Sequence, residues 1–134
     1  MLRKLHIESK IANIRSIETA IDDLTTEYNI SQEQYGKILI ATLEAVNNAI
    51  IHGNRSDKTK FVDIELEIKR NELTITVTDE GKGFRPMEIP DPTKPENIEA
   101  INVRGVFLMR RLADKIKFNK EGNSVKMTFK NISY

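Results

Sequence analysis

The stretch FVDIELEIKRNELTITVTD, residues 61–79, decides the fold class of this chain. Apolar and polar side chains alternate through it, with a short polar interruption at residues 70–72. A period of two predicts the two strands of a hairpin, each with one face in the core and the other in water. Strands at the centre of a doubly wound parallel sheet are apolar on both faces, so that class of fold is disfavoured.

The sequence before this hairpin predicts one strand and two helices. Residues 3–9 (RKLHIES) alternate like a strand, and residues 14–29 (IRSIETAIDDLTTEYN) carry isoleucine and leucine at helical spacing. Ser31 followed by Gln34 resembles a capping box, which predicts that a second helix begins here and runs to about Gly53. The amino-terminal half is therefore expected to supply two helices that pack on the hairpin.

The sequence after the hairpin predicts an irregular segment, a helix and a second hairpin. All four prolines fall between Pro86 and Pro95, so we expect no regular structure there. Residues 103–114 predict a third helix, and residues 115–120 and 124–130 predict a closing hairpin. The expected fold is α+β: one domain, residues 1–134, built as a two-layer α/β sandwich with about three helices on one face of a mixed, largely antiparallel sheet.

Composition excludes several classes of protein. A chain of 134 residues with 39% hydrophobic and 31% charged residues is typical of one globular domain. It has no cysteine, so disulfides and thiolate zinc sites are excluded, and its two histidines are too few for a histidine-rich metal site. No stretch reaches the roughly 18–20 apolar residues of a membrane span, and no apolar signal core follows the amino terminus. We therefore expect a cytoplasmic protein that does not bind a membrane.

Charge is unevenly distributed along the chain. Residues 101–134 carry eight Lys or Arg and two Asp or Glu, whereas the whole chain has a net charge of +1. Such a basic segment either attracts nucleic acid or phosphate groups or forms an ordinary solvated face. The segment lacks the aromatic platforms of a single-strand binder, which favours the solvated face and predicts no direct binding of nucleic acid.

The second predicted helix contains a line of polar residues within an apolar run, LEAVNNAIIHGN at residues 43–54. On a helical wheel the expected core stripe is Leu39, Leu43, Val46 and Ile50. Four polar residues form a continuous line on another arc: Glu44, Asn47, Asn48 and His52. The line is either a solvated face or the wall of a cleft. Because alanines interleave it and no Lys or Arg occurs in it, the cleft wall is the better interpretation.

A buried carboxylate is expected at the end of the second hairpin strand. The alternation of the preceding apolar residues places Asp79 on the packing face if the strand continues that far. A charge on that face needs a partner, because burying it unpaired is costly. Gly81 and Gly83, in the sequence DEGKGF, allow the backbone to approach a ligand closely. The arrangement suits a flat heterocycle with an exocyclic amine, such as adenine, and the alternative is an ordinary turn from strand to loop.

Common phosphate-binding motifs are absent from the sequence. No GxxxxGK[ST] occurs, and Pro86 stands where GxGxxG needs its third glycine. Arg104 and Gly105 instead open the third predicted helix. A helix amino terminus presents free N–H groups to phosphate, and an arginine there adds positive charge.

Three segments together resemble the motifs of the Bergerat-fold, histidine kinase-like ATPases, which include gyrases and histidine kinases. EAVNNAIIHGN resembles the N box, DEGKGF the first glycine box, and RGVFLMRRLADKI a second glycine box with its helix. The short chain, the EAxxNAIxHG form and TKPE in the loop are most similar to bacterial anti-sigma factor serine/threonine-protein kinases. The resemblance covers about residues 1–130.

The resemblance implies a role for each candidate site residue. Asn48 would coordinate Mg²⁺ through its amide oxygen, the metal bridging the ATP phosphates. Glu44, one turn earlier, would be the catalytic base that acts on an attacking hydroxyl. Asp79 would accept a hydrogen bond from the adenine amine, with Gly81 and Gly83 beside it.

The resemblance also implies how the phosphates are covered. An ATP lid would span about residues 84–102 and include Thr93 and Lys94. Three residues of the second glycine box would lie against the phosphates and so bind ATP: Arg104, Gly105 and Val106. One departure is visible, because the family usually has glycine where this chain has Val103.

The activity implied by the resemblance is phosphoryl transfer from ATP to a serine or threonine of an anti-sigma factor antagonist. The kinase would also sequester a sigma factor, often as a homodimer. One alternative, motivated by Val103, is a nucleotide-binding regulatory module that sequesters a partner without kinase activity. Another is the ATP-binding fragment of a histidine kinase, which is disfavoured because His6 lies in a predicted strand and no phosphoacceptor helix precedes the N box.

Overall fold

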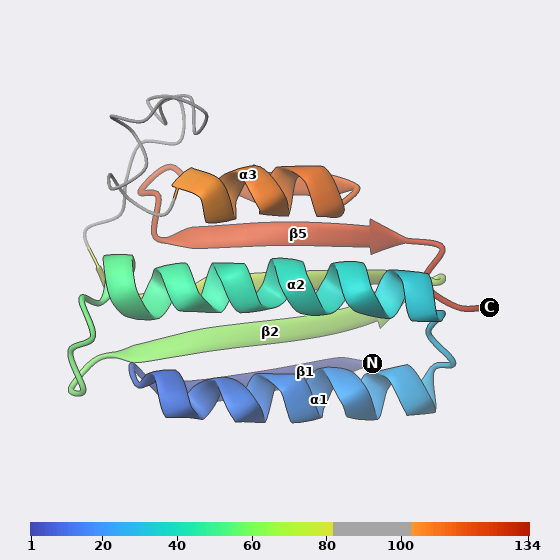
Figure 1. The fold of residues 1–134 in the computed structure, drawn as a ribbon, viewed down its shortest axis with the longest axis horizontal. Coiled ribbons are helices and arrows are strands. Elements are labelled where there is room, and N and C mark those ends of the chain that lie inside the picture. Colours follow the sequence, from blue (N-terminus) through green and yellow to red (C-terminus); the bar gives the residue numbers. More distant parts are fainter. Residues whose placement is uncertain (82–102) are drawn as a thin grey trace.

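The computed structural model describes residues 1–81 and 103–134, so the lid expected at residues 84–102 lies outside the described residues. Three α-helices lie side by side over one face of a five-stranded sheet, and no helix of the described residues covers the other face (Figure 1). This is the two-layer α+β sandwich that the predicted helices and strands together indicated.

The sheet has the strand order β1-β2-β3-β5-β4, and each pairing between these described strands is antiparallel. Its strands are β1 (Leu2–Glu8), β2 (Phe61–Lys69), β3 (Glu72–Thr78), β4 (Lys115–Phe118) and β5 (Ser124–Lys130). The β2–β3 hairpin is in the register expected from its alternation, with Leu66 opposite Ile75. Its turn has φ values of 51° at Arg70 and 62° at Asn71, and two positive values are what a two-residue type I′ turn requires.

The helical layer has the second helix at its centre, with one helix on each side. Helix α1 (Ile14–Glu27) follows a short 3-10 turn, η1 (Ile11–Asn13), and α2 (Gln32–Asn48) lies between α1 and α3 (Val103–Leu112) (Figure 1). Ser31 caps α2 as predicted, because its Oγ accepts a hydrogen bond from the backbone N–H of Gln34 at 3.2 Å. None of the helices within the described ranges is long and apolar enough to span a bilayer.

The end of the second predicted helix differs from an ordinary α-helix. Residues Ala49–Gly53 form a π-helical turn, η2, that continues α2 without a break. The backbone N–H of Asn54 donates to the carbonyl of Ala49 at 2.8 Å, a hydrogen bond that spans five residues. Such turns are rare and occur frequently at functional sites.

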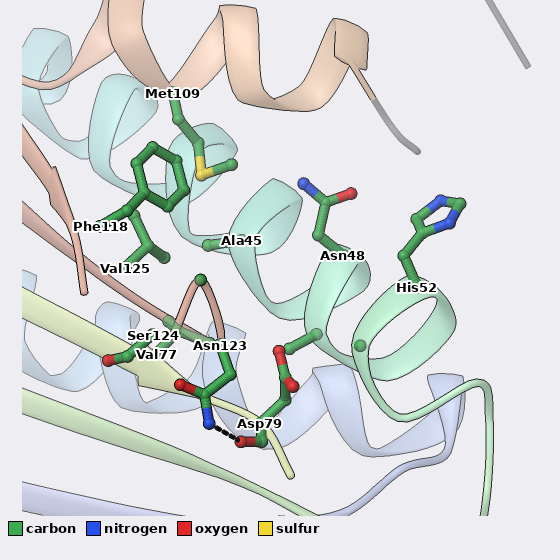
Figure 2. Close-up of a pocket in the computed structure, with 13 residues that line it drawn as sticks. Ala45, Asn48, His52, Val77, Asp79, Met109, Phe118, Asn123, Ser124 and Val125 are labelled. Carbon is green, nitrogen blue, oxygen red and sulfur yellow. Dashed lines mark hydrogen bonds between the residues drawn. The ribbon is translucent and has the colours of Figure 1, made fainter. Parts of the chain in front are cut away.

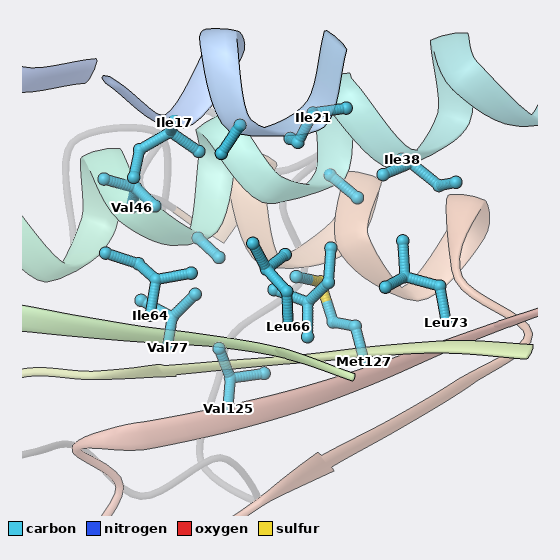
Figure 3. Close-up of a cluster of buried hydrophobic side chains, with 14 of the residues drawn as sticks. Ile17, Ile21, Ile38, Val46, Ile64, Leu66, Leu73, Val77, Val125 and Met127 are labelled. Atoms are coloured by element: carbon cyan, nitrogen blue, oxygen red, sulfur yellow. The ribbon is translucent and has the colours of Figure 1, made fainter. Parts of the chain in front are cut away.

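The core lies between the helical layer and the sheet, where side chains from α1, α2, β2, β3 and β5 meet (Figure 3). The alternating apolar residues from Val62 to Val77 point into it, and Leu66, Leu73 and Ile75 are fully buried, whereas Phe61 at the start of β2 stacks on His6 outside the core. Fully burying one such side chain contributes about 1.5–3 kcal/mol to folding. The period-two pattern therefore identified the sheet's share of the core.

The core stripe predicted for the second helix is half wrong. Val46 and Ile50 are fully buried as expected, but Leu39 and Leu43 are only half-buried. The other buried residues of this helix are Ile38, Ala41, Thr42, Ala45 and Ala49. The helix contacts α1, α3 and the sheet, so it is buried on more than one side. A helical wheel that assumes a single buried face therefore predicts the wrong centre for the buried residues.

Candidate functional site

A pocket opens between the end of α2, the end of β3 and the turn that joins β4 to β5 (Figure 2). Its apolar wall is formed by Ala45, Val77, Met109, Phe118 and Val125. Its polar side chains are Asn48, His52, Asp79, Asn123 and Ser124. An apolar wall with a few convergent polar groups is typical of sites that bind small molecules.

Asn48 brings the buried oxygen of its side-chain amide to this pocket. The residue is the last of α2, and its side chain projects from the helix at the pocket (Figure 2). Its Oδ1 is buried and accepts no hydrogen bond from the described part of the chain. Leaving a buried acceptor unsatisfied costs about 1–3 kcal/mol, so this oxygen is suited to meet a ligand or a cation.

Strand β3 delivers Asp79 to the same pocket, as its alternation predicted. The backbone N–H of Asp79 donates to the carbonyl of Asn123 at 2.9 Å, so pairing with the neighbouring strand continues past the end of β3. Its Oδ1 accepts a hydrogen bond from the backbone N–H of Gly81 at 2.7 Å. Burial raises the pKa of the Asp79 carboxyl, and the Gly81 hydrogen bond and the charge of Lys60 oppose that rise. The partner that the carboxylate needs is thus a backbone N–H.

Two glycines allow the end of the helix and the end of the strand to touch. A Cβ on Gly53 would lie 2.3 Å from Cγ of Asp79, and a Cβ on Gly81 would lie 2.0 Å from the carbonyl oxygen of Gly53. Neither position tolerates a side chain unless the neighbouring atoms move. Gly81 was expected to bring the backbone close to a ligand, and in the structure it lies close to the backbone of Gly53.

The turn between β4 and β5 forms the wall opposite α2, a role that the sequence did not reveal. Asn123 Nδ2 donates to the carbonyl of Asp79 at 3.0 Å, and Asn119 Nδ2 donates to Asn123 Oδ1 at 2.7 Å. Oδ1 of Asn119 accepts from the backbone N–H groups of Asn123 and Ser124 at 3.0 and 3.1 Å. Gly122 has a φ of 76°, which favours glycine. These hydrogen bonds hold the turn against the end of β3.

The polar line predicted on the second helix is a pocket wall along half of its length. Asn48 and His52 line the pocket, and the His52 side chain is exposed at its edge (Figure 2). Glu44 and Asn47 are half-buried and do not line the pocket. Glu44 lies one helical turn before Asn48, so it is a neighbour of the pocket.

The second glycine box falls at the start of α3. Val103 is the first residue of this helix, and Gly105 and Val106 are buried in it. The Val106 side chain belongs to the core, so a phosphate at this helix could meet its backbone only. The side chain of Arg104 lies outside the described residues. So do three other predicted site residues: Gly83, Thr93 and Lys94.

A model of the histidine kinase-like ATPase domain matches residues 7–129, nearly the whole chain. The chain belongs to the histidine kinase-like ATPase family. The resemblance carried by the three motifs is therefore confirmed, and the pocket lies among the parts of those motifs that the structure describes. The α+β sandwich is the fold expected of this ATPase family.

Curated relatives of this ATPase domain are anti-sigma F factors. The chain is 32% identical over 124 residues to the anti-sigma F factor of Clostridium perfringens (strain SM101 / Type A), with 90% of this chain and 87% of the relative covered. It is 29% identical over 133 residues to the anti-sigma F factor of Clostridium beijerinckii, covering 95% of this chain and 92% of the relative. The alignment with the protein of another Clostridium perfringens strain is shorter and spans 61% of that relative.

A solved structure has a similar fold. The crystal structure of the RsbU and RsbW domains of Rv1364c from Mycobacterium tuberculosis superposes with a TM-score of 0.70 and 14% sequence identity. The superposition covers 97% of this chain, which spans 32% of the length of that larger chain. At this identity the likeness establishes the fold of the ATPase domain alone.

Proposed function

We propose that this chain is an ATP-binding serine/threonine-protein kinase that acts as an anti-sigma factor and phosphorylates an anti-sigma factor antagonist. One observation carries the proposal: the Asn48 amide oxygen, which has no hydrogen-bond partner among the described residues, and the half-buried carboxylate of Asp79 line the same pocket from a helix and from a strand. The anti-sigma F factors among the relatives support the regulatory part of the proposal.

The adenine would bind at the Asp79 end of the pocket. Oδ1 of Asp79 already accepts from Gly81, which leaves the second carboxylate oxygen to accept from the exocyclic amine. Met109 and Phe118 would pack against the ring from the apolar wall. One oriented acceptor in an apolar cleft distinguishes adenine from a base that carries a carbonyl oxygen at the same position.

The phosphates would bind at the Asn48 end, together with Mg²⁺. Oδ1 of Asn48 is a hard oxygen donor without a hydrogen-bond partner among the described residues, so it fits a magnesium ligand. Within residues 1–81 and 103–134 no cluster of three or more His, Asp or Glu could hold a metal. A site with few protein ligands suits Mg²⁺, which keeps several waters and is held largely by substrate phosphates. When bound, the ion would neutralise negative charge on those phosphates.

The remaining ATP contacts are proposed on the family resemblance. The first residues of α3 (Arg104, Gly105 and Val106) would present N–H groups and positive charge to the phosphates. The lid would bring Thr93 and Lys94 over the nucleotide, and Gly83 would stay beside Gly81 near the adenine.

Glu44 would be the catalytic base. It would take the proton of a serine or threonine hydroxyl while that oxygen forms a bond to the γ-phosphorus and the bond to the β–γ bridging oxygen breaks, releasing ADP. Its place on α2, one helical turn before the proposed magnesium ligand Asn48, supports this role. A base for a protein substrate must meet a hydroxyl that arrives from outside the nucleotide site.

The proposed partners follow from this activity. They are a sigma factor, which the chain would sequester, and the antagonist, which would supply the acceptor hydroxyl. We also propose a homodimer located in the cytoplasm, without direct binding to nucleic acid or membrane. Incubation with ATP labelled at the γ-phosphate, Mg²⁺ and the antagonist tests the proposal. We expect label on a serine or threonine of the antagonist.

A second candidate function is a nucleotide-binding module that sequesters its partner without phosphorylating it. It is favoured by Val103, a β-branched residue at a position where the family usually has glycine. The same labelling experiment separates the two functions. Tight ATP binding with an unlabelled antagonist would support the module and would exclude the kinase.

A further inference from the structure

We propose that Asn54 is a positioning residue of the nucleotide pocket, which holds the turn that carries Asp79 against the end of the second helix. The inference rests on the proposed function in one respect, namely that Asp79 binds adenine. The positioning itself follows from the contacts of Asn54, a residue that lies just after η2 and outside the pocket lining.

Asn54 is a buried polar residue whose side chain joins three strand ends. It is 1% exposed. Its Nδ2 donates to Ser9 Oγ at 2.7 Å and to the carbonyl of Phe61 at 2.9 Å, next to the end of β1 and at the start of β2. Its Oδ1 accepts from the backbone N–H of Glu80 at 2.7 Å, just beyond β3. Every hydrogen bond that this buried amide makes is therefore to a different segment of the chain.

The acceptor side of Asn54 faces the nucleotide site. Glu80 stands between Asp79 and Gly81, the two residues whose hydrogen bond orients the carboxylate. Among the described residues, the bond from Glu80 N–H to Asn54 Oδ1 is the single hydrogen bond between residues 49–54 and residues 79–81. It therefore ties the strand end to the helix end at the point where they touch.

This tie explains why the two walls of the pocket stay in close contact. The carboxylate of Asp79 lies so near Gly53 that no Cβ fits between them. A van der Waals contact of this kind is too weak to hold two backbone segments together. The buried hydrogen bond between Glu80 and Asn54, one residue away from this contact, is stronger. Without this hydrogen bond, Asp79 stays paired with Asn123, but among the described residues no hydrogen bond joins residues 79–81 to η2, so the carboxylate that would accept from adenine is held less firmly against the helix end.

The donor atom of Asn54, Nδ2, contacts residues outside the nucleotide pocket. Its bonds to Ser9 and Phe61 anchor the residue in the sandwich, and Ser9 Oγ itself donates to the carbonyl of Lys60 at 2.8 Å. Loss of a donor bond should lower the stability of the fold and leave the turn in place. The two sides can therefore be separated by substitution.

Three variants separate them. Asn54→Ala removes both sides, Asn54→Asp keeps an acceptor for Glu80 N–H but loses the donors, and Ser9→Ala removes one anchor as a matched control for stability. Each is compared with the wild-type chain by calorimetric titration with ADP and with GDP, at a temperature where circular dichroism shows the variant folded. Exchange of the Glu80 amide hydrogen is measured by NMR without nucleotide.

We expect Asn54→Ala to bind ADP about tenfold more weakly, with a smaller loss for GDP, because one oriented contact is lost. Its Glu80 amide should exchange at least about tenfold faster. Asn54→Asp and Ser9→Ala should unfold at lower temperature, yet bind ADP within about twofold of the wild-type affinity.

Several results would overturn the inference. Wild-type ADP affinity in folded Asn54→Ala is one, and an equal loss of affinity in Ser9→Ala is another. If Asn54→Ala does not fold, the inference is tested with Asn54→Asp, and a tenfold loss of ADP affinity in that folded variant would overturn it. A wild-type chain that binds no ADP contradicts the proposed function instead, and the exchange of the Glu80 amide then still decides whether Asn54 positions the turn.

Discussion

Gly53, at the end of the π-helical turn, lies against the carboxylate of Asp79 so closely that a Cβ at position 53 would be 2.3 Å from Cγ of Asp79. The helix that carries Asn48 and the strand that carries Asp79 therefore meet through a residue without a side chain. A Cβ added there must displace the Asp79 carboxylate from its place in the proposed ATP site.

Gly53→Ala is expected to destabilise the fold by about 1–3 kcal/mol, the usual cost of overpacking a closely packed site. It should also weaken ADP binding, because Asp79 must move. Urea unfolding and calorimetric titration measure the two effects. The matched control is Gly36→Ala in α2, where an added Cβ meets nothing within 4 Å. The control should gain about 0.5–1 kcal/mol from helix propensity, and equal effects in both variants would contradict the packing argument.

Asp79→Asn should make the unliganded fold at least as stable as the wild type at neutral pH. Burial raises the pKa of this carboxyl, so the stability it contributes is complete below the unfolded-state pKa and is lost as the pH rises through the folded-state pKa. Asparagine keeps an oxygen for Gly81 and has no charge to bury. Thermal unfolding against pH should show the difference at neutral pH and none in acid, while ADP affinity falls about tenfold or more.

Asp57→Asn is the control with the opposite sign. Hydrogen bonds from the side chain and backbone of Thr59 lower the pKa of the Asp57 carboxyl. Its contribution is therefore present above the unfolded-state pKa and is lost as the pH falls through the folded-state pKa. This variant should be less stable than the wild type at neutral pH. If both variants respond to pH with the same sign, burial is not the dominant influence on Asp79.

Glu44→Gln should bind ATP normally and lose transfer to the antagonist. Glutamine keeps the shape of the side chain but cannot take a proton, and removal of a general base typically slows a reaction about 10²–10⁴-fold. Single-turnover transfer of labelled phosphate, with ATP affinity measured in parallel, tests this. Glu33→Gln, on the same helix and outside the pocket, is the control and should transfer at the wild-type rate. Undiminished transfer by Glu44→Gln would remove Glu44 as the base.

Asn48→Ala should abolish the dependence of ATP affinity on Mg²⁺ without harming the fold. The substitution removes a buried oxygen that has no hydrogen-bond partner among the described residues, and alanine is the better helix former. We therefore expect an equal or higher unfolding temperature, together with about tenfold weaker ATP binding in Mg²⁺. With a chelator present, variant and wild type should bind alike. Asn47→Ala, one residue earlier and outside the pocket lining, should retain the Mg²⁺ dependence.

Much of the fold could be predicted because it depends on local patterns. The period of two across residues 61–79 identified both strands, their buried faces and the parity that brings Asp79 to the pocket. Ser31 identified the start of α2, since a cap acts within a single turn of helix. The helix wheel failed at Leu39 and Leu43, because their burial depends on the neighbours α1 and α3 and not on the period of the helix itself.

The sequence predicted those residues of the candidate site whose side chains are unusual for their apolar surroundings. Asn48 and Asp79 were identified by an amide and a carboxylate in apolar surroundings, and both line the pocket. Glu44 was identified in the same way, but its position outside the pocket lining could not be read from a wheel. Asn119 and Asn123 were missed, because the turn between β4 and β5 has the composition of an ordinary hairpin connection.

By itself, the sequence determined the order of helices and strands, the buried face of each hairpin strand and the Asn48 and Asp79 side chains that line the pocket. These properties arise from backbone periodicity and side-chain chemistry, which act over a few residues. Only the tertiary structure decided that Gly53 must lack a side chain, that Asn54 ties the helix end to Glu80, and that the β4–β5 turn closes the pocket. Each of these depends on a contact between segments far apart in the chain, and no local pattern encodes such a contact.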